Sequence, residues 1–117
     1  LDHQVFKSTM LSDTVQEELN LMVADYSGWH WLNHDPREKL SPPAIARLAE
    51  LTCPTLIITG SQDLSYFQTI ADKYHHDIFG SKKISIPEAG HMVNMEKPEL
   101  FNSVVEQFLR NSNSRSL

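Results

Sequence analysis

The chain has very little cysteine and glycine, and it has no long apolar run. Its 117 residues contain a single cysteine, Cys53, so no disulfide can form within the chain. None of the four glycines stands in a Gly-x-Ser-x-Gly arrangement or opens a Gly-x-Gly-x-x-Gly loop, so these 117 residues hold neither a serine-nucleophile turn nor a dinucleotide-binding loop. No apolar stretch approaches the roughly 18 residues that a membrane-spanning helix needs. We therefore expect no membrane segment, and the lone cysteine fits a reducing, cytoplasmic setting.

Basic charge is also scarce. Ten Lys and Arg residues stand against fifteen Asp and Glu residues, which gives a net charge of −5. A surface of that sign repels phosphate backbones and anionic lipid headgroups, so we expect neither nucleic acid nor a membrane as a partner. The length suits one small domain with a modest core.

The first half of the sequence predicts helices. After an N-terminal stretch without clear periodicity, apolar residues recur at helical spacing from Ser12 to about Gly28, and Ser12 or Asp13 is available as the N-cap. A second helix is expected from about Ser41 until Pro54 forbids its continuation. Its apolar face would consist of Ile45, Leu48 and Leu51.

The second half alternates strands and helices. Thr55–Thr59 is a short β-branched run bounded by Pro54 and Gly60, which is typical of a strand buried on both faces of a parallel sheet. The elements expected after it are a helix over 65–75, a strand over 83–87 and a helix over 98–109. This order predicts an α/β fold with two adjacent parallel strands and helices on opposite faces. Residues 111–117 are polar and are expected to form a disordered tail.

Two polar residues follow the two predicted strands. Asp63 lies just past the first strand, and His91 lies just past the second. Because the carboxyl ends of adjacent parallel strands share one rim of the sheet, both side chains are expected there together, in contact through the imidazole Nδ1. A carboxylate in that position fixes the imidazole tautomer and stabilises the imidazolium, as proton removal from a hydroxyl requires.

Two stretches around these residues resemble α/β hydrolases. The run 54–63, Pro-Thr-Leu-Ile-Ile-Thr-Gly-Ser-Gln-Asp, looks like the penultimate core strand with its acid loop. The run 87–98, Pro-Glu-Ala-Gly-His-Met-Val-Asn-Met-Glu-Lys-Pro, is similar to the last strand, histidine loop and start of the final helix. The resemblance covers residues 36–110 closely and residues 1–35, as a cap-derived helical segment, only loosely. It implies the C-terminal portion of the fold: the last two parallel core strands with flanking helices.

The resemblance also implies a function. Asp63 corresponds to the acid and His91 to the general base of a catalytic triad, whose order along the chain is nucleophile, acid, histidine. The nucleophile elbow is absent here, so the expected function is part of a hydrolase that acts on an ester, lactone, amide or similar bond, with a small-molecule substrate and no cofactor or metal. This chain alone is expected to be inactive. Relatives with an aspartate nucleophile act on epoxides and haloalkanes, which leaves the nucleophile's identity open.

The site residues also have structural interpretations that need no catalytic role. Asp63 could serve only as the N-cap of the following helix, and His91 could be a surface loop histidine. Met92, Trp29 and Trp31 are candidates for the lining of a substrate pocket, although core packing explains the tryptophans as well.

Three further residues, His30, His34 and Cys53, are more simply explained without a functional role. His30 and His34 are spaced like metal ligands on a helix, but no Glu follows the first histidine and Pro36 interrupts the segment, which disfavours a metal site. Cys53 lacks a basic neighbour in the sequence, and a buried, inert thiol is expected.

The strand Thr55–Thr59 has a second implication. With only two strands predicted, one edge of this strand has no neighbour, and such an edge readily pairs with another chain. We therefore expect a homo-oligomer formed through that edge. The alternative function, from a different class, is a non-catalytic association module derived from the same fold.

Overall fold

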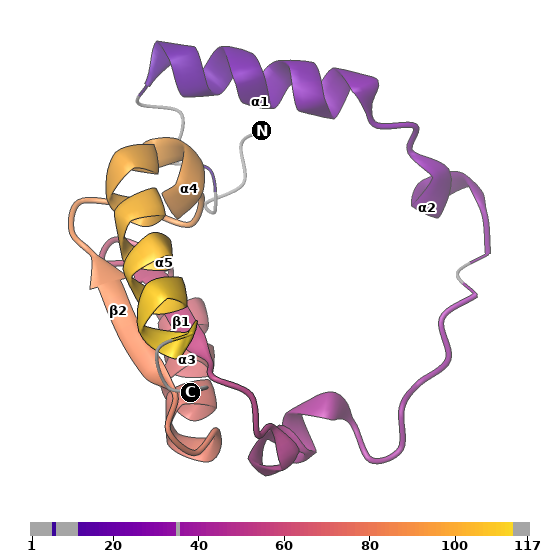
Figure 1. The fold of residues 1–117 in the computed structure, drawn as a ribbon. Helices are drawn as coiled ribbons and strands as arrows, with labels where there is room; N and C mark the ends of the chain where they lie inside the picture. The colour runs from indigo at the N-terminus through magenta and orange to yellow at the C-terminus, as the bar shows by residue number, and fades with distance from the viewer. Residues whose placement is uncertain (1–5, 7–11, 35, 114–117) are drawn as a thin grey trace.

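The computed structural model describes residues 6, 12–34 and 36–113. The N-terminal stretch expected to lack regular structure lies, apart from Phe6, outside the described residues. The elements in chain order are α1 (Asp13–Asp25), α2 (Trp29–Leu32), the 3₁₀ turns η3 (Ala44–Ala46) and η4 (Leu48–Glu50), β1 (Leu56–Gly60), α3 (Ser65–Asp77), β2 (Lys82–Ile86), α4 (Val93–Glu96) and α5 (Pro98–Asn113) (Figure 1).

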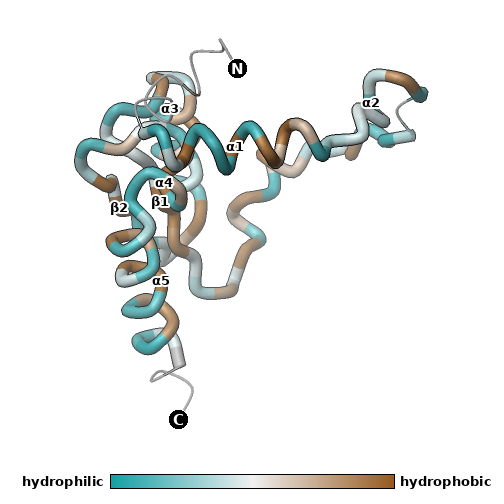
Figure 2. Tube along the Cα trace, turned by 90° about the horizontal axis from the view of Figure 1, so that it is seen from above, coloured by the Kyte–Doolittle hydropathy of each residue, from teal (hydrophilic) through white to brown (hydrophobic). Residues whose placement is uncertain are grey.

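The two strands form one parallel pair. β1 and β2 are neighbours in register, from Leu56 opposite Lys82 to Gly60 opposite Ile86. Helix α3 lies on one face of this pair and α5 on the other, as the two perpendicular views show (Figures 1 and 2). The predicted α/β class, the parallel pairing and the opposite placement of the helices are thus confirmed, with strand boundaries displaced by one residue.

The hydrophobic core is small and lies between the sheet and α5. Ile86, Ala89 and Val93 form its buried centre, and Ile86 is the most deeply buried large side chain at 1% exposure. Around this centre pack Ile58, Ile84, Phe101 and Val104. β2 contributes the alternate side chains Ile84 and Ile86, as a pleated strand covered by a helix should, and β1 contributes Ile58.

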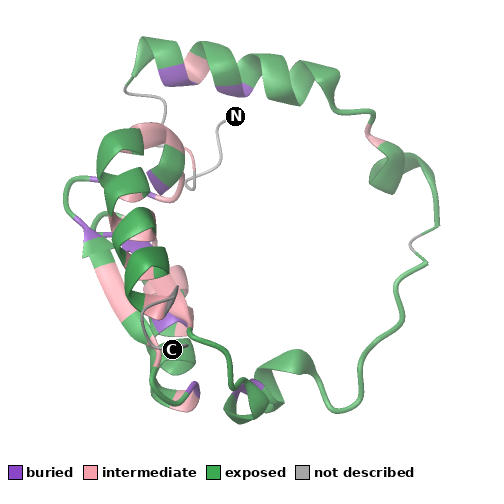
Figure 3. Ribbon diagram, in the orientation of Figure 1, coloured by how far each residue is buried: buried purple, intermediate pink, exposed green. Residues whose placement is uncertain are grey.

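The connection between α2 and η3 contrasts with this core. The described residues from Pro36 to Pro43 are all exposed, and they form part of a wide arch that leaves the sheet (Figures 1 and 3). Helix α1 forms where predicted, with Val15 and Leu19 buried. Ser12 occupies its N-cap position but makes no side-chain capping hydrogen bond. The sequence pattern thus located α1 and its N-cap residue, but the expected side-chain capping hydrogen bond is not formed.

The second predicted helix, from Ser41 to Leu51, is wrong. Two 3₁₀ turns, η3 and η4, take its place. A residue that precedes proline is disfavoured in the α region, so Pro42 cannot start a helix before Pro43, which is itself extended. Of the expected apolar face only Leu48 is buried, whereas Ile45 and Leu51 are about 40% exposed.

Two further expectations are wrong: the start of the disordered C-terminal tail and the burial of Cys53. Helix α5 runs to Asn113, so the start of the expected tail is helical, and residues 114–117 lie outside the described residues. Cys53 is exposed rather than buried, because it lies in the irregular connection between η4 and β1. No helix in the described part of the chain is long and apolar enough to cross a membrane.

Candidate active site

The loops that follow β1 and β2 are locked together by hydrogen bonds. The Ser61 N–H donates to the Ile86 carbonyl at 2.8 Å, and the Gln62 N–H donates to the Ala89 carbonyl at 2.8 Å. In return, the Glu88 N–H donates to the Ser61 hydroxyl at 3.0 Å. The relative position of the two loops is therefore set by two backbone hydrogen bonds and the Ser61 hydroxyl, independently of the Asp63 and His91 side chains.

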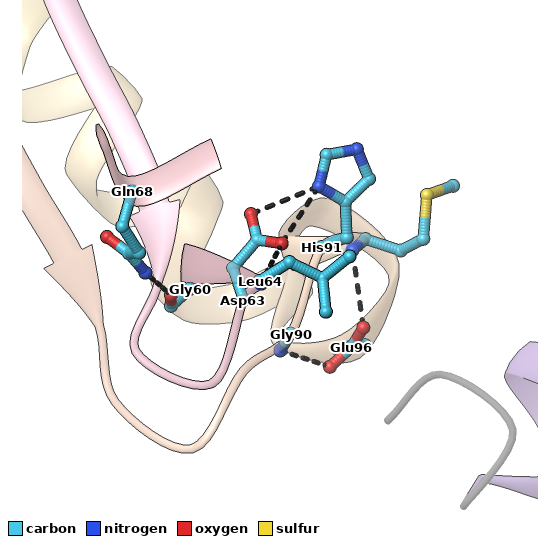
Figure 4. A network of polar contacts seen from close by, with 8 residues as sticks. Gly60, Asp63, Leu64, Gln68, Gly90, His91 and Glu96 are labelled. Atoms are coloured by element: carbon cyan, nitrogen blue, oxygen red, sulfur yellow. Dashed lines mark hydrogen bonds and ion pairs between the residues drawn. The ribbon is translucent and has the colours of Figure 1, made fainter. Parts of the chain in front are cut away.

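Gly60 allows this close approach. A Cβ atom built at Gly60 would lie 2.1 Å from the Gly90 carbonyl oxygen and 2.2 Å from that of Ala89. Backbone atoms cannot move aside as a flexible side chain can, so any larger residue would push the two loops apart. The Gly60 carbonyl also accepts a hydrogen bond from the Gln68 side-chain amide of α3 (Figure 4).

The locked loops bring Asp63 and His91 into contact. The His91 Nδ1 lies 3.0 Å from Oδ2 and 3.2 Å from Oδ1 of Asp63 (Figure 4). The Asp63 side chain is only 5% exposed, whereas that of His91 is 32% exposed. The predicted contact through Nδ1 is confirmed, over a sequence separation of 28 residues.

Asp63 is not the N-cap of α3. Leu64 occupies that position, and α3 has no side-chain capping hydrogen bond. The Asp63 Oδ1 instead accepts the Leu64 N–H at 2.7 Å. The carboxylate is thus held by a backbone donor on its own loop while it faces the imidazole, so it has little freedom to turn away.

The two ring nitrogens of His91 differ: Nδ1 contacts Asp63, and Nε2 does not. When Asp63 is ionised it can only accept, so a neutral His91 paired with it carries its hydrogen on Nδ1 and keeps the lone pair on Nε2. Within the described part of the chain Nε2 has no hydrogen-bond partner, and Figure 4 shows it pointing away from Asp63. The Phe67 ring packs on the imidazole, with ring centroids 4.1 Å apart. This geometry suits a general base that takes up a proton at Nε2.

A groove lined mainly by β1 and α3 lies beside this pair. Its volume is about 210 Å³. Asp63 and His91 line its rim, and the rest of its lining comes mainly from β1 and α3: Ile57, Ile58, Thr59, Phe67, Ile70, Ala71, Tyr74 and Val93. Thr59 is 6% exposed, and its hydroxyl oxygen has no hydrogen-bond partner among the described residues. A buried hydroxyl without a partner is uncommon in folded proteins.

The structure does not bring the three expected pocket residues together. Met92 follows His91 directly and is half-buried, but it does not line the groove. Trp29 and Trp31 belong to α2, on the arch, and Trp31 is 86% exposed. Trp31 lines a separate hollow with Tyr26, His30 and Arg37. The role of all three in a substrate pocket stays a prediction.

Metal ligands do not gather in the described residues, where no group of three His, Cys, Asp or Glu side chains is close enough to hold an ion. His30 lies in α2, and His34 lies beyond the end of that helix. The two histidines therefore do not share the single helix face that their spacing suggests.

Three residues of the site were missed by sequence reasoning. Gln68 and Phe67 lie in the first turn and a half of α3, where they reach Gly60 and His91. Glu96 ends the short helix α4, which the sequence pattern did not predict, and its carboxylate accepts the N–H groups of Gly90 at 2.7 Å and Met92 at 3.3 Å. The available signal for Phe67 was its position in the first turn of the helix that follows the Asp63 loop.

Comparison with known proteins places this geometry in context. No family model matches the chain. The putative 2-succinyl-6-hydroxy-2,4-cyclohexadiene-1-carboxylate synthase of Bacillus subtilis (strain 168) is 35% identical over 68 residues, which are 58% of this chain and 24% of that protein. The crystal structure of a predicted CIB-like hydrolase from Thermoplasma acidophilum matches 57% of this chain and 32% of its own, with a TM-score of 0.55 and 31% identity.

Both matches cover only part of each protein. The chain spans about a quarter of the length of the curated relative and about a third of the matched structure. Over the matched part, this chain has the α/β fold of a hydrolase and is related to α/β hydrolases.

Proposed function

We propose that Asp63 and His91 are the acid and the general base of an α/β hydrolase that cleaves an ester, lactone, amide or similar bond. The observation that carries this proposal is the contact between Asp63 and the His91 Nδ1, which leaves Nε2 unpaired in the described structure. The carboxylate is buried and the imidazole is partly exposed, as a base that must meet a substrate requires.

The proposed chemistry needs a nucleophile from the rest of an intact protein. Nε2 of His91 accepts the proton of a serine hydroxyl as the oxygen attacks the carbonyl carbon, and Asp63 stabilises the resulting imidazolium. His91 then returns this proton to the leaving group when the bond to it breaks. With an aspartate nucleophile, the same base would instead deprotonate the water that hydrolyses the covalent intermediate.

The names of the two relatives bear on how far the proposal reaches. One is called a synthase and the other a hydrolase, so a shared pair of side chains is compatible with more than one overall reaction. What the pair supplies is proton transfer at one atom. The bond that is cleaved depends on the nucleophile and the pocket, which this proposal assigns to the remainder of the protein.

This chain alone should not turn over substrate. A base without a nucleophile and an oxyanion hole has nothing to activate or to stabilise. With an activated ester such as p-nitrophenyl acetate, we expect a rate no higher than that of free histidine at the same concentration. Turnover that survives purification and is abolished by Asp63→Ala would contradict this expectation.

The decisive test uses an intact protein that joins this sequence to a nucleophile, as the proposal requires. We expect its reading frame to hold a nucleophile elbow upstream of Leu1. In that protein Asp63→Asn and His91→Gln should each lower kcat/KM by roughly 1,000-fold, since general acid–base catalysis supplies that order of rate. Asp25→Asn and His76→Gln, on exposed positions, are the matched controls. Full activity of the Asp63 and His91 variants would refute the proposal.

We also propose that the free edge of β1 is a site of association, here between two copies of the chain. Thr55 accepts a hydrogen bond from β2 and Ser61 donates one toward it. By alternation along the strand, the N–H and C=O groups of Leu56 and Ile58 point to the other edge, which has no neighbour in the described structure. An unpaired edge beside an apolar groove favours strand addition.

Light scattering at micromolar concentration tests the association. We expect a dimer or a larger species, and Leu56→Pro should shift it to monomer by removing one N–H donor from the free edge. Thr52→Pro, outside the strand, is the control. A wild-type monomer would refute association through this edge and would leave the proposed chemistry untouched.

A further inference from the structure

A second carboxylate, that of Glu96, lies close to the loop that carries His91. Glu96 ends α4, five residues after His91, and it is half-buried. Its Oε2 accepts the Gly90 N–H at 2.7 Å, and its Oε1 accepts the Met92 N–H at 3.3 Å. The two donors belong to the residues immediately before and after His91, as Figure 4 shows for Gly90.

This arrangement clamps the backbone on both sides of the histidine. A carboxylate that accepts backbone N–H groups makes charge-assisted hydrogen bonds, which are stronger than bonds between neutral groups. Because one rigid carboxylate holds both amides, the backbone torsion angles of His91 have little freedom. The direction in which the imidazole leaves the backbone is fixed accordingly.

The other contacts of His91 do not provide this restraint. Asp63 holds the imidazole from the far end, through Nδ1, and Phe67 packs against the ring. Neither contact acts on the backbone of residues 90–92. The hydrogen bonds between the two loops reach Ala89 and end there, one residue before Gly90. The Met92 carbonyl accepts the N–H groups of Met95 and Glu96 at 2.9 Å each, which ties the end of the loop to α4. The Glu96 carboxylate adds a restraint on the two N–H groups that flank His91, those of Gly90 and Met92.

We propose that Glu96 is a positioning residue, which sets the backbone around His91 so that Nδ1 faces Asp63 and Nε2 faces the substrate. This inference deepens the proposed function and rests on it, because it assumes that the orientation of His91 matters for catalysis. Glu96 acts through His91 and contacts no reacting atom.

The proposal makes a graded prediction. Glu96→Ala removes both acceptors, whereas Glu96→Gln keeps one oxygen and presents an amide N–H₂ to the other donor, which cannot accept from it. The amide protons of Gly90 and Met92 should therefore exchange with solvent roughly tenfold to a hundredfold faster in Glu96→Ala, with a smaller increase in Glu96→Gln. Glu99→Gln, on an exposed glutamate in the first turn of α5, is the matched control.

The readout that separates positioning from simple loop stability is the imidazole itself. Nuclear magnetic resonance of this chain, with ¹⁵N-labelled histidine, reports which ring nitrogen of His91 carries the hydrogen; the spectrum of His91→Gln assigns the signal. In wild type and in Glu99→Gln we expect the Nδ1–H form with a slowly exchanging proton. In Glu96→Gln we expect that proton to exchange at least tenfold faster, and in Glu96→Ala the fixed tautomer to be lost.

Each outcome decides the question. If Glu96→Gln leaves the His91 proton and tautomer unchanged while the Gly90 amide exchanges faster, Glu96 supports the loop without positioning the histidine, and the proposal is overturned. If Glu96→Ala fails to fold, Glu96→Gln alone supplies the answer. A wild-type His91 without the Nδ1–H form would count against the proposed function itself, so the two failures are distinguishable.

Discussion

Two helices of the same length behave differently in this protein. Helices α1 and α3 each contain 13 residues, and apolar residues at helical spacing predicted both. Helix α3 packs on the strand pair, with Ala71 buried against it and its first turn building the site. Helix α1 leaves Leu21, Met22 and Val23 half-exposed or more. A helical pattern therefore predicts that a helix forms, but its burial depends on a partner that the pattern does not contain.

The same contrast extends to the segments around the two helices. Residues 56–113 form a unit in which strands and helices share one core. Residues 12–51 carry large apolar side chains that remain exposed, including Trp31, Leu32 and Leu40. Exposed apolar surface of this extent is typical of a face that meets another surface. Among the described residues of 12–51, only Val15, Leu19 and Leu48 are buried.

The largest expected effect tests this contrast directly. Ile86→Ala, in the core, should lower the free energy of unfolding by about 3 kcal/mol, because it removes a fully buried side chain and leaves a cavity. Leu32→Ala, at a position 81% exposed, should change it by less than about 0.5 kcal/mol. Urea unfolding followed by circular dichroism measures both. Similar losses would show that the segment over 12–51 is packed after all.

A second prediction concerns the contact between the two loops of the site. Gly60→Ala should cost about 2–3 kcal/mol, because its Cβ would collide with the Ala89 and Gly90 carbonyls. Gly80→Ala is the control: its φ of 73° also disfavours a side chain, but no atom lies within 4 Å of the added Cβ, so about 1 kcal/mol is expected. Equal losses for the two variants, by urea unfolding, would refute the steric account.

Only part of the fold and of the site could be predicted from the sequence. The strand pair, its direction and the meeting of Asp63 with His91 followed from short-range patterns and from the rule that parallel strands share a carboxyl rim. The collision at Gly60 and the clamp at Glu96 did not follow. Both depend on where two loops approach within hydrogen-bond distance, and no periodicity encodes that approach. The helix expected from Ser41 failed for a local reason, since consecutive prolines exclude the α region there.

The third prediction tests the place where the two segments touch. Leu48 in η4 is the one buried residue of the failed helix's apolar face, and η4 lies against α3. Leu48→Ala should therefore cost about 2 kcal/mol, less than Ile86→Ala, because the site lies at the rim of the packed unit. Leu40→Ala, 66% exposed on the arch, is the control and should cost under about 0.5 kcal/mol. A Leu48→Ala variant as stable as wild type would mean that the segments are independent.

The smallest expected effect is electrostatic. It compares the aspartate at the end of α3 with the aspartate at the end of α1. Asp77 ends α3, where Lys73 lies 2.5 Å from Oδ2 and the His76 Nδ1 lies 2.7 Å from Oδ1. The hydrogen bond from Lys73, and next that from His76, hold the pKa of the Asp77 carboxyl below its ordinary value. Asp25, at the end of α1, makes no ion pair or side-chain hydrogen bond among the described residues.

The sign of the pH dependence follows from that lowered pKa. A carboxyl whose pKa is lower in the folded state than in the unfolded state stabilises the fold above its unfolded pKa, and this contribution is lost as pH falls through the folded pKa. Asp77→Asn should therefore lower the urea midpoint slightly at neutral pH and match wild type at the acid end of the titration. Asp25→Asn should show no such convergence. A difference between Asp77→Asn and wild type that persists undiminished in acid would show that Asp77 acts through packing, and α3 would then owe none of its advantage over α1 to charge.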